Sequence, residues 1–188
     1  GRNQKLLVAS EKANDRLQSP VFSPDGASVY FLRRNEGRSA IFRVPATGGD
    51  PEFVWQPDEG SAENFISFSP DGSKIAYHHV VEKGDANTET PTFRICVRPI
   101  DGSQSPKCFE LPARRAAVQW HDDNSFDFAA GAFNTSTVLK QRVDGDLPEK
   151  LFEVPERVFG MAWSPDKKDI VLARGRQNGD ALLITNLP

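Results

Sequence analysis

One six-residue segment occurs four times along this chain of 188 residues, and this repeat restricts the fold more than any other feature of the sequence. The copies occupy residues 21–26, 67–72, 119–124 and 162–167. They begin 46, 52 and 43 residues apart, and the second position of every copy is aromatic. A repeat of this length predicts a fold in which one small structural unit is stacked on copies of itself.

The first two copies contain Ser-Pro-Asp-Gly, which is the composition of a tight turn rather than of an active site. Proline sets φ at about −65°, aspartate accepts hydrogen bonds from nearby N–H groups, and glycine adopts the left-handed conformation. The third copy has Asn124 in the glycine position, and asparagine tolerates a positive φ. The fourth has Lys167, where a left-handed residue costs ~1 kcal/mol or more. We therefore expect a different or looser turn at Lys167.

Short apolar or alternating runs follow each copy and predict strands. They lie at residues 28–32, 40–44, 52–56, 74–78, 93–97, 107–111, 125–129, 137–142, 150–154, 169–173 and 181–185. Together with the strand that carries the aromatic residue of the motif, they make units of up to four strands, which is the size of a β-propeller blade. We expect an all-β propeller of four blades, each a four-stranded antiparallel sheet. The motif aromatics Phe22, Phe68, Trp120 and Trp163 are expected to pack between neighbouring blades.

The Phe-Ser-Pro-Asp-Gly and Trp-Ser-Pro-Asp segments resemble the PD40 or WD40-like repeats of TolB-type β-propellers. The resemblance covers most of the chain, is closest in the first two copies, good in the fourth and weakest in the third. It implies a bacterial repeat protein of which these blades form the C-terminal part. It also favours a periplasmic or extracytoplasmic location.

We expect residues 1–188 to form one domain, with repeats at about 5–50, 51–104, 105–147 and 148–188. The fourth repeat lacks an outermost strand, and the apolar run at residues 5–10 is predicted to supply it. Each repeat would then contain its outermost strand first and its three inner strands after it. This arrangement permits a closed four-bladed ring. The alternative is a partial ring of a larger propeller, whose exposed apolar faces would favour a homodimer.

Composition excludes two classes of function. Hydrophobic residues make up 38% and charged residues 26% of the chain, as in folded globular proteins, and the net charge is −3. A protein that binds nucleic acid through its phosphates needs a concentrated positive surface, so nucleic acid is not an expected partner. The longest apolar runs contain six residues, far fewer than the ~20 that a membrane-spanning helix requires.

The loops at one end of the blades are the expected binding surface, because propellers commonly bind partners there. Positive and negative side chains are equally numerous in these loops, which suits a protein partner or a small ligand. The candidate binding residues are Arg33, Arg34, Arg38, Arg114, Arg115, Arg174 and Arg176. We expect a non-catalytic interaction module, the sensory or interaction end of a longer protein.

Residues for catalysis or metal binding do not converge in the sequence. TolB-like oligogalacturonate lyases hold a metal through histidines and a glutamine, but His78 and His79 are adjacent in a strand and point to opposite faces. His121 is at the end of a different strand beside an acidic turn, where a hydrogen-bonded surface imidazole is expected, so neither a metal site nor a cofactor is expected. There is also no Gly-x-Ser-x-Gly nucleophile motif. The alternative is a fragment of an enzyme, either a metal-dependent lyase of this kind or the gating domain of a prolyl-oligopeptidase-type peptidase.

The two cysteines, Cys96 and Cys108, lie the same number of residues before and after Gly102. They are therefore expected to face each other across a hairpin. Residues directly opposed on antiparallel strands lie ~4.5 to 5.5 Å apart at Cα, which permits a disulfide. The simpler interpretation is that they are two small apolar residues on one face of the sheet, and the disulfide is the alternative. A disulfide would indicate an oxidising compartment.

Overall fold

The structure is a computed structural model that describes residues 4–10, 15–81, 92–111, 118–131, 135–145 and 147–176. All regular secondary structure in these ranges is β-strand, as expected. The ranges contain no helix that is long and apolar enough to cross a membrane.

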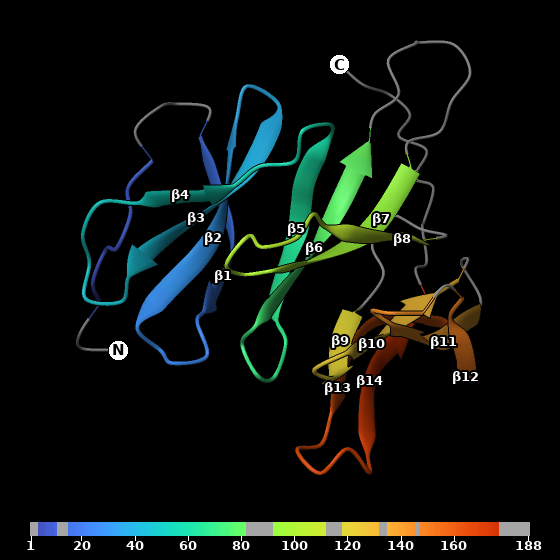
Figure 1. The fold of residues 1–188 in the computed structure, drawn as a ribbon. Coiled ribbons are helices and arrows are strands. Elements are labelled where there is room, and N and C mark those ends of the chain that lie inside the picture. The colour runs from blue at the N-terminus through green and yellow to red at the C-terminus, as the bar shows by residue number, and fades with distance from the viewer. Residues whose placement is uncertain are drawn as a thin grey trace, which may run out of the picture.

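The strands form antiparallel sheets of consecutive strands (Figure 1). The first sheet contains β1 (Arg16–Phe22), β2 (Ser28–Asn35), β3 (Arg38–Pro45) and β4 (Glu52–Trp55). The second contains β5 (Ser61–Phe68), β6 (Lys74–Val81), β7 (Thr92–Pro99) and β8 (Lys107–Leu111). The third contains β9 (Val118–Asp122), β10 (Ser125–Ala130), β11 (Thr135–Arg142) and β12 (Glu149–Pro155). The fourth pairs β13 (Arg157–Trp163) with β14 (Ile170–Gly175), and the strand expected at residues 181–185 lies outside the described residues.

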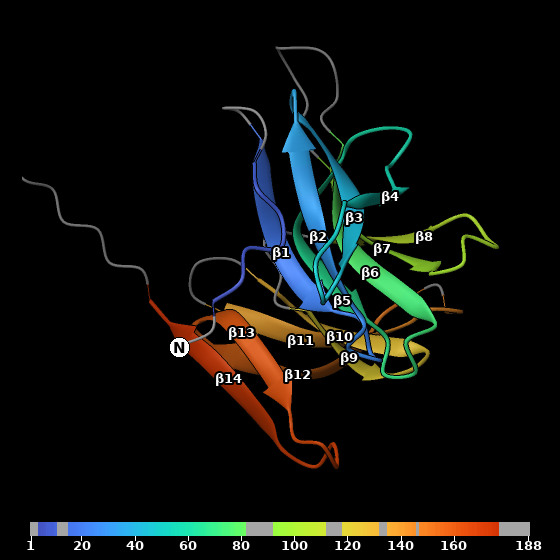
Figure 2. The same cartoon turned by 90° about the vertical axis from the view of Figure 1, so that its left-hand side faces the viewer.

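The sheets follow one another in sequence order in a curved row, with the first and the fourth at its ends (Figures 1 and 2). A core of buried side chains lies between each pair of neighbours. The first and second sheets enclose Leu32, Ile41, Ile75 and Tyr77, and the second and third enclose Ile95, Phe109, Trp120 and Phe126. Between the third and fourth lie Ala129, Val138, Val154 and Val158. No core among the described residues joins the first sheet to the fourth.

The repeated motif forms the predicted tight turn. In the first sheet the N–H of Gly26 donates to the carbonyl oxygen of Ser23 at 2.8 Å, and Ser23 Oγ donates to Asp25 Oδ1 at 2.5 Å. In the second sheet the N–H of Gly72 donates to the carbonyl oxygen of Ser69 at the same distance. Both glycines have a positive φ, at 69° and 72°. The serine and aspartate side chains thus close a turn that the glycine conformation permits.

The expectation of a different turn at Lys167 is wrong. Its N–H donates to the carbonyl oxygen of Ser164 at 2.9 Å, as in the other copies, and its φ is 60°. Ser164 Oγ still donates to Asp166 Oδ1 at 2.6 Å, and Lys167 Nζ donates to the carbonyl oxygen of Trp120 at 3.2 Å. These bonds offset the cost of a left-handed lysine. The third copy is the one that differs, because Asp122 pairs directly with Ser125 across a two-residue connection.

Three of the four motif aromatics pack between sheets, as predicted. Phe68 of the second sheet meets the ring of Tyr30 edge-on at 4.9 Å, and Trp120 of the third sheet is 2% exposed in the core shared with the second. Trp163 of the fourth sheet donates a hydrogen bond to Asp127 of the third. Phe22 is the exception and is 63% exposed. The reason is that no sheet precedes the first in the described chain.

The run at residues 5–10 does not form the strand that was expected to complete the last blade. Its Leu7 and Val8 pack instead against Val29, Phe31 and Val44, on the face of the first sheet that is turned away from the second. Lys5 Nζ donates to the carbonyl oxygen of Thr47 and holds the run there. The apolar side chains of this run therefore bury themselves on a nearby sheet face rather than pairing as a strand edge.

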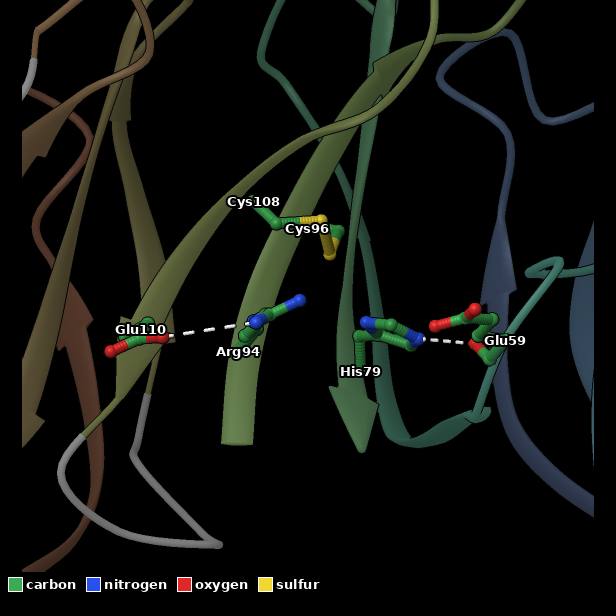
Figure 3. The surroundings of a disulfide bond; sticks show 6 residues. All are labelled: Glu59, His79, Arg94, Cys96, Cys108 and Glu110. Carbon is green, nitrogen blue, oxygen red and sulfur yellow. Dashed lines mark hydrogen bonds and ion pairs between the residues drawn. A yellow bond between two sulfur atoms is a disulfide. The ribbon is translucent and has the colours of Figure 1, made fainter. Parts of the chain in front are cut away.

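Cys96 in β7 and Cys108 in β8 are direct cross-strand partners, as their equal sequence separations from Gly102 predict. They form a disulfide, with Cα atoms 4.0 Å apart (Figure 3). Of the two interpretations that the sequence leaves open, the structure contains the bonded one.

Candidate functional site

Arg33 and Arg38, two of the predicted binding residues, lie at the ends of β2 and β3 where these strands form a hairpin. Arg33 Nη2 donates to Asp15 Oδ2 at 2.6 Å, and the Asp15 side chain is completely buried. Arg38 Nη2 donates to the carbonyl oxygens of Pro57 and Asp58 at 2.7 and 3.0 Å. Both guanidinium groups therefore hold neighbouring chain segments in place.

The other arginines do not join them in one patch. Arg34 faces the opposite side of β2 from Arg33, because side chains alternate along a strand. Arg174 and Arg176 lie at the end of the fourth sheet, where each approaches a carboxylate oxygen of Glu156, at 3.9 and 3.4 Å. Figure 1 shows β2 and β14 at opposite ends of the molecule. Arg114 and Arg115 lie outside the described residues.

A hollow of about 410 Å³ lies beside the β2–β3 hairpin, on the face of the first sheet that is turned away from the second. Its walls are formed by Arg33, Asn35, Glu36, Arg38, Ala40, Phe42, Phe53 and Gln56. The guanidinium of Arg33 lies 5.7 Å from the ring centroid of Phe42, and Phe53 meets Phe42 edge-on at 5.7 Å. Phe53 is 61% exposed. The hollow thus combines aromatic rings with a guanidinium group.

A second hollow of about 280 Å³ lies on the same face and is mainly apolar. It is lined by Lys5, Leu6, Leu7, Val8, Leu17, Gln18, Pro20, Val29, Phe31 and Val44. Leu6 at its rim is exposed. We call the surface formed by the residues that line the two hollows the outer face of the first sheet. This outer face is a candidate binding surface in the described part of the chain.

A buried carboxylate joins the third sheet to the fourth. Asp127 Oδ2 accepts a hydrogen bond from Trp163 Nε1 at 2.6 Å and lies 2.9 Å from Nδ1 of His121. The Asp127 side chain is fully buried, and the rings of His121 and Trp163 meet edge-on at 5.3 Å. The position of His121 beside an acidic turn predicted a hydrogen bond for its ring, but nothing in that prediction pointed to Asp127. A carboxylate in the middle of the apolar run at residues 125–130 was the available signal.

The three histidines lie in separate surroundings. The ring of His78 lies 5.2 Å from that of Phe65, on one face of β6. His79 is on the other face and makes a contact of 2.7 Å between Nε2 and the carbonyl oxygen of Glu59. His121 belongs to the third sheet and is paired with Asp127. The structure therefore does not bring these histidines together.

The chain matches no protein-family model and no curated protein sequence. Known structures do resemble it in fold. A putative TolB from Agrobacterium tumefaciens superposes with a TM-score of 0.61 at 24% identity, over 85% of this chain and 54% of that one. This chain is a β-propeller in fold. The sheets stacked face to face, each with its strands in sequence order, are propeller blades.

Two enzymes with propellers are similar to the same degree. An oligogalacturonate lyase in complex with manganese has a TM-score of 0.63 at 15% identity, over 90% of this chain and 50% of that one. The acylaminoacyl peptidase of Pyrococcus horikoshii has a TM-score of 0.60 at 18% identity, over 76% of this chain and 26% of that one. This chain thus spans between about a quarter and half of the length of these proteins. At such identities the likeness concerns the propeller fold alone.

Proposed function

We propose that this propeller is a non-catalytic interaction module and that it binds a protein partner through the outer face of the first sheet. The observation that carries the proposal is the composition of that face, where the exposed Phe53 and Leu6 flank two hollows. Contiguous exposed apolar surface on a soluble protein is typical of interaction sites.

The chemistry of this face suits a protein partner better than an anionic ligand. Aromatic residues and arginine are enriched where proteins meet one another. The charge of Arg33 is already balanced by Asp15 at 2.6 Å, and Arg38 is directed to two carbonyl oxygens. The rings of Phe42 and Phe53 are therefore the larger part of the available contact. A small ligand that enters either hollow is the alternative occupant.

The absence of catalysis is supported by the way in which the polar side chains of the described residues are used. The arginines and carboxylates with the closest contacts are paired with each other or with backbone groups. The buried Asp127 is directed at two N–H donors from neighbouring strands, which braces two sheets. These arrangements stabilise the fold and leave the outer face for recognition.

A second candidate function is that of a propeller segment of a peptidase or a lyase. It is favoured by the similarity to the P. horikoshii peptidase and to oligogalacturonate lyase, which are longer than this chain. The intact protein would then cleave acylaminoacyl peptides or oligogalacturonate. Steady-state assays with both substrates test this alternative, and turnover with either one would contradict the non-catalytic proposal.

Photo-crosslinking tests the proposed binding face. A benzophenone analogue of phenylalanine at position 53 of the intact protein, produced in its own cells, should give a discrete protein adduct upon irradiation. The same analogue at Leu147, an exposed apolar position in the connection between β11 and β12, is the matched control and should give no such adduct. Equal adducts at the two positions, or none at position 53, would contradict the proposal.

The partner found in this way should bind a Phe53→Ser variant about tenfold more weakly or worse. An adduct of the chain with itself would identify the partner as a second copy.

A further inference from the structure

The disulfide lies beside a histidine on the face of the second sheet that meets the first (Figure 3). A ring nitrogen of His79 and the sulfur atoms of Cys96 and Cys108 all lie within 4.8 Å of one another. The two sulfurs come from facing positions on β7 and β8, and His79 is on the adjoining strand β6. These residues include two of the ligand types that zinc prefers, thiolate sulfur and imidazole nitrogen.

His79 is oriented as a metal ligand would need to be. Its Nε2 lies 2.7 Å from the carbonyl oxygen of Glu59, and because a carbonyl oxygen only accepts, Nε2 carries the hydrogen. Nδ1 then has the free lone pair of a neutral imidazole. The residue is only 8% exposed, and its Nδ1 is buried without a hydrogen-bond partner among the described residues. A histidine that ligates a metal commonly donates its other ring N–H to such a carbonyl group.

The backbone at residues 59 and 60 holds the ring in this position. A Cβ atom at Gly60 would come within 2.9 Å of His79 Nε2 and within 2.2 Å of the carbonyl oxygen of Val80. The chain therefore passes too close to the ring for any larger residue. In Figure 3 the ring turns Nε2 toward Glu59 and its other nitrogen toward the side of the disulfide.

We propose that the reduced Cys96–Cys108 pair and Nδ1 of His79 form a zinc-binding site. A thiol reductant converts the disulfide to two cysteine thiols, and two molecules of the reductant are joined in a disulfide. Zn²⁺ then displaces one proton from each thiol and binds both thiolates together with the imidazole, and water takes the fourth position. Zinc bonds of about 2.3 Å to sulfur would hold the two sulfurs about 3.8 Å apart in a tetrahedral site.

Access and charge are both consistent with this site. Cys108 is exposed, so a reductant and a metal ion can reach the pair, whereas Cys96 is completely buried. Two thiolates, a neutral imidazole and a divalent cation carry no net charge, and this limits the cost of burial. Arg94 lies on the same face near the disulfide, and Glu110 approaches its guanidinium at 3.7 Å (Figure 3).

Cobalt binding to the intact protein tests the proposal. The protein is reduced with a phosphine, freed of the reductant without air, and titrated with Co²⁺ as a spectroscopic substitute for zinc. We expect a thiolate-to-cobalt charge-transfer band, visible bands of tetrahedral cobalt, and saturation at one ion per chain. Zn²⁺ should remove these bands, and the oxidised protein should show none. Failure of the reduced protein to develop the bands would overturn the proposal.

A pair of histidine variants assigns the third ligand. His79→Gln should bind Co²⁺ at least about tenfold more weakly, because loss of even an outer hydrogen bond to a metal ligand commonly costs that much. His78→Gln is the matched control, since its side chain lies on the opposite face of β6, and it should bind as the unaltered chain does. Equal affinities of the two variants would exclude His79. X-ray absorption of the zinc-loaded chain needs no variant and should show two sulfur ligands and one imidazole. A shell of oxygen ligands alone would overturn the site.

Discussion

The first and second sheets have the same strand order and the same turn, but only the second is covered on both faces. Phe68 and Phe22 occupy the same position of the repeat, and Phe68 packs against Tyr30 whereas Phe22 is exposed. The turns next to them are closed by the same hydrogen bonds at 2.8 Å. The comparison teaches that the repeat determines strand and turn locally, while burial of its aromatic residue requires a preceding sheet.

The same difference explains where a binding face arises. The inner face of the first sheet meets the second sheet and contributes Leu32 and Ile41 to a closed core. On its outer face, Val29 and Val44 are covered mainly by Leu7 and Val8. A few residues of irregular chain cover less area than a whole sheet does. The hollows and the exposed Phe53 are the part that they leave uncovered.

The largest expected effect is at a covered aromatic. Trp120→Ala should lower the free energy of unfolding by about 3–5 kcal/mol, because it empties a buried site between the second and third sheets. Urea unfolding followed by circular dichroism measures the loss. The control is Phe22→Ala at the same position of the repeat, which should change stability by no more than about 0.5 kcal/mol. Similar losses in the two variants would show that Phe22 is covered in solution.

The next effect concerns the contact between the third and fourth sheets. Asp127→Ala should lower the free energy of unfolding by about 2–4 kcal/mol, since it leaves Trp163 Nε1 and the imidazole of His121 without their acceptor. The fluorescence of Trp163 should shift in the folded variant as its surroundings change. Asp144→Ala is the control, because that exposed carboxylate pairs with the exposed Arg142 two residues away and its loss should have little effect. A loss no greater than that of the control would mean that the buried carboxylate does not brace these sheets.

Local chemistry explains what the sequence could predict. The four-stranded repeat, the turn at residues 23–26 and the Cys96–Cys108 register follow from spacing and turn residues close in sequence. The exposure of Phe22 and the position of residues 5–10 depend on which sheet face is left open, and no local pattern states that. The arginines were predicted as one surface because their partners were unknown. The bond from Arg33 to Asp15 joins residues 18 apart, and nothing in the sequence selects this carboxylate over others.

A smaller effect is expected at the glycines of the first two turns, where the stability costs of one substitution can be compared directly. Gly72→Ala should cost about 2 kcal/mol, because φ is 72° and the new Cβ would lie 2.7 Å from Cγ of Pro24 in the neighbouring turn. Gly26→Ala has nearly the same φ but meets no atom within 4 Å, and should cost about 1 kcal/mol. Thermal or urea unfolding of the two variants measures the difference. Equal costs would show that the turn of the first sheet does not press on that of the second.

The smallest effect is the pH dependence of the same turn. Hydrogen bonds from Ser69 and Ser73 lower the pKa of Asp71 to about 2, from 3.8 in an unfolded chain. A carboxyl group with a lowered pKa in the folded state stabilises it above the unfolded pKa, and this stabilisation is lost as the pH falls from about 4 toward about 2. Asp71→Asn should therefore be less stable than the unaltered chain near neutral pH, by less than about 1 kcal/mol because the group is exposed, and the difference should vanish near pH 2. Urea unfolding at several pH values measures this difference.

Ser23 lowers the pKa of Asp25 in the same way, so Asp25→Asn should show the same trend. If the pH-dependent difference appeared for Asp71→Asn alone, the neighbouring sheet would be its cause. The explanation by hydrogen bonds within the turn would then be wrong.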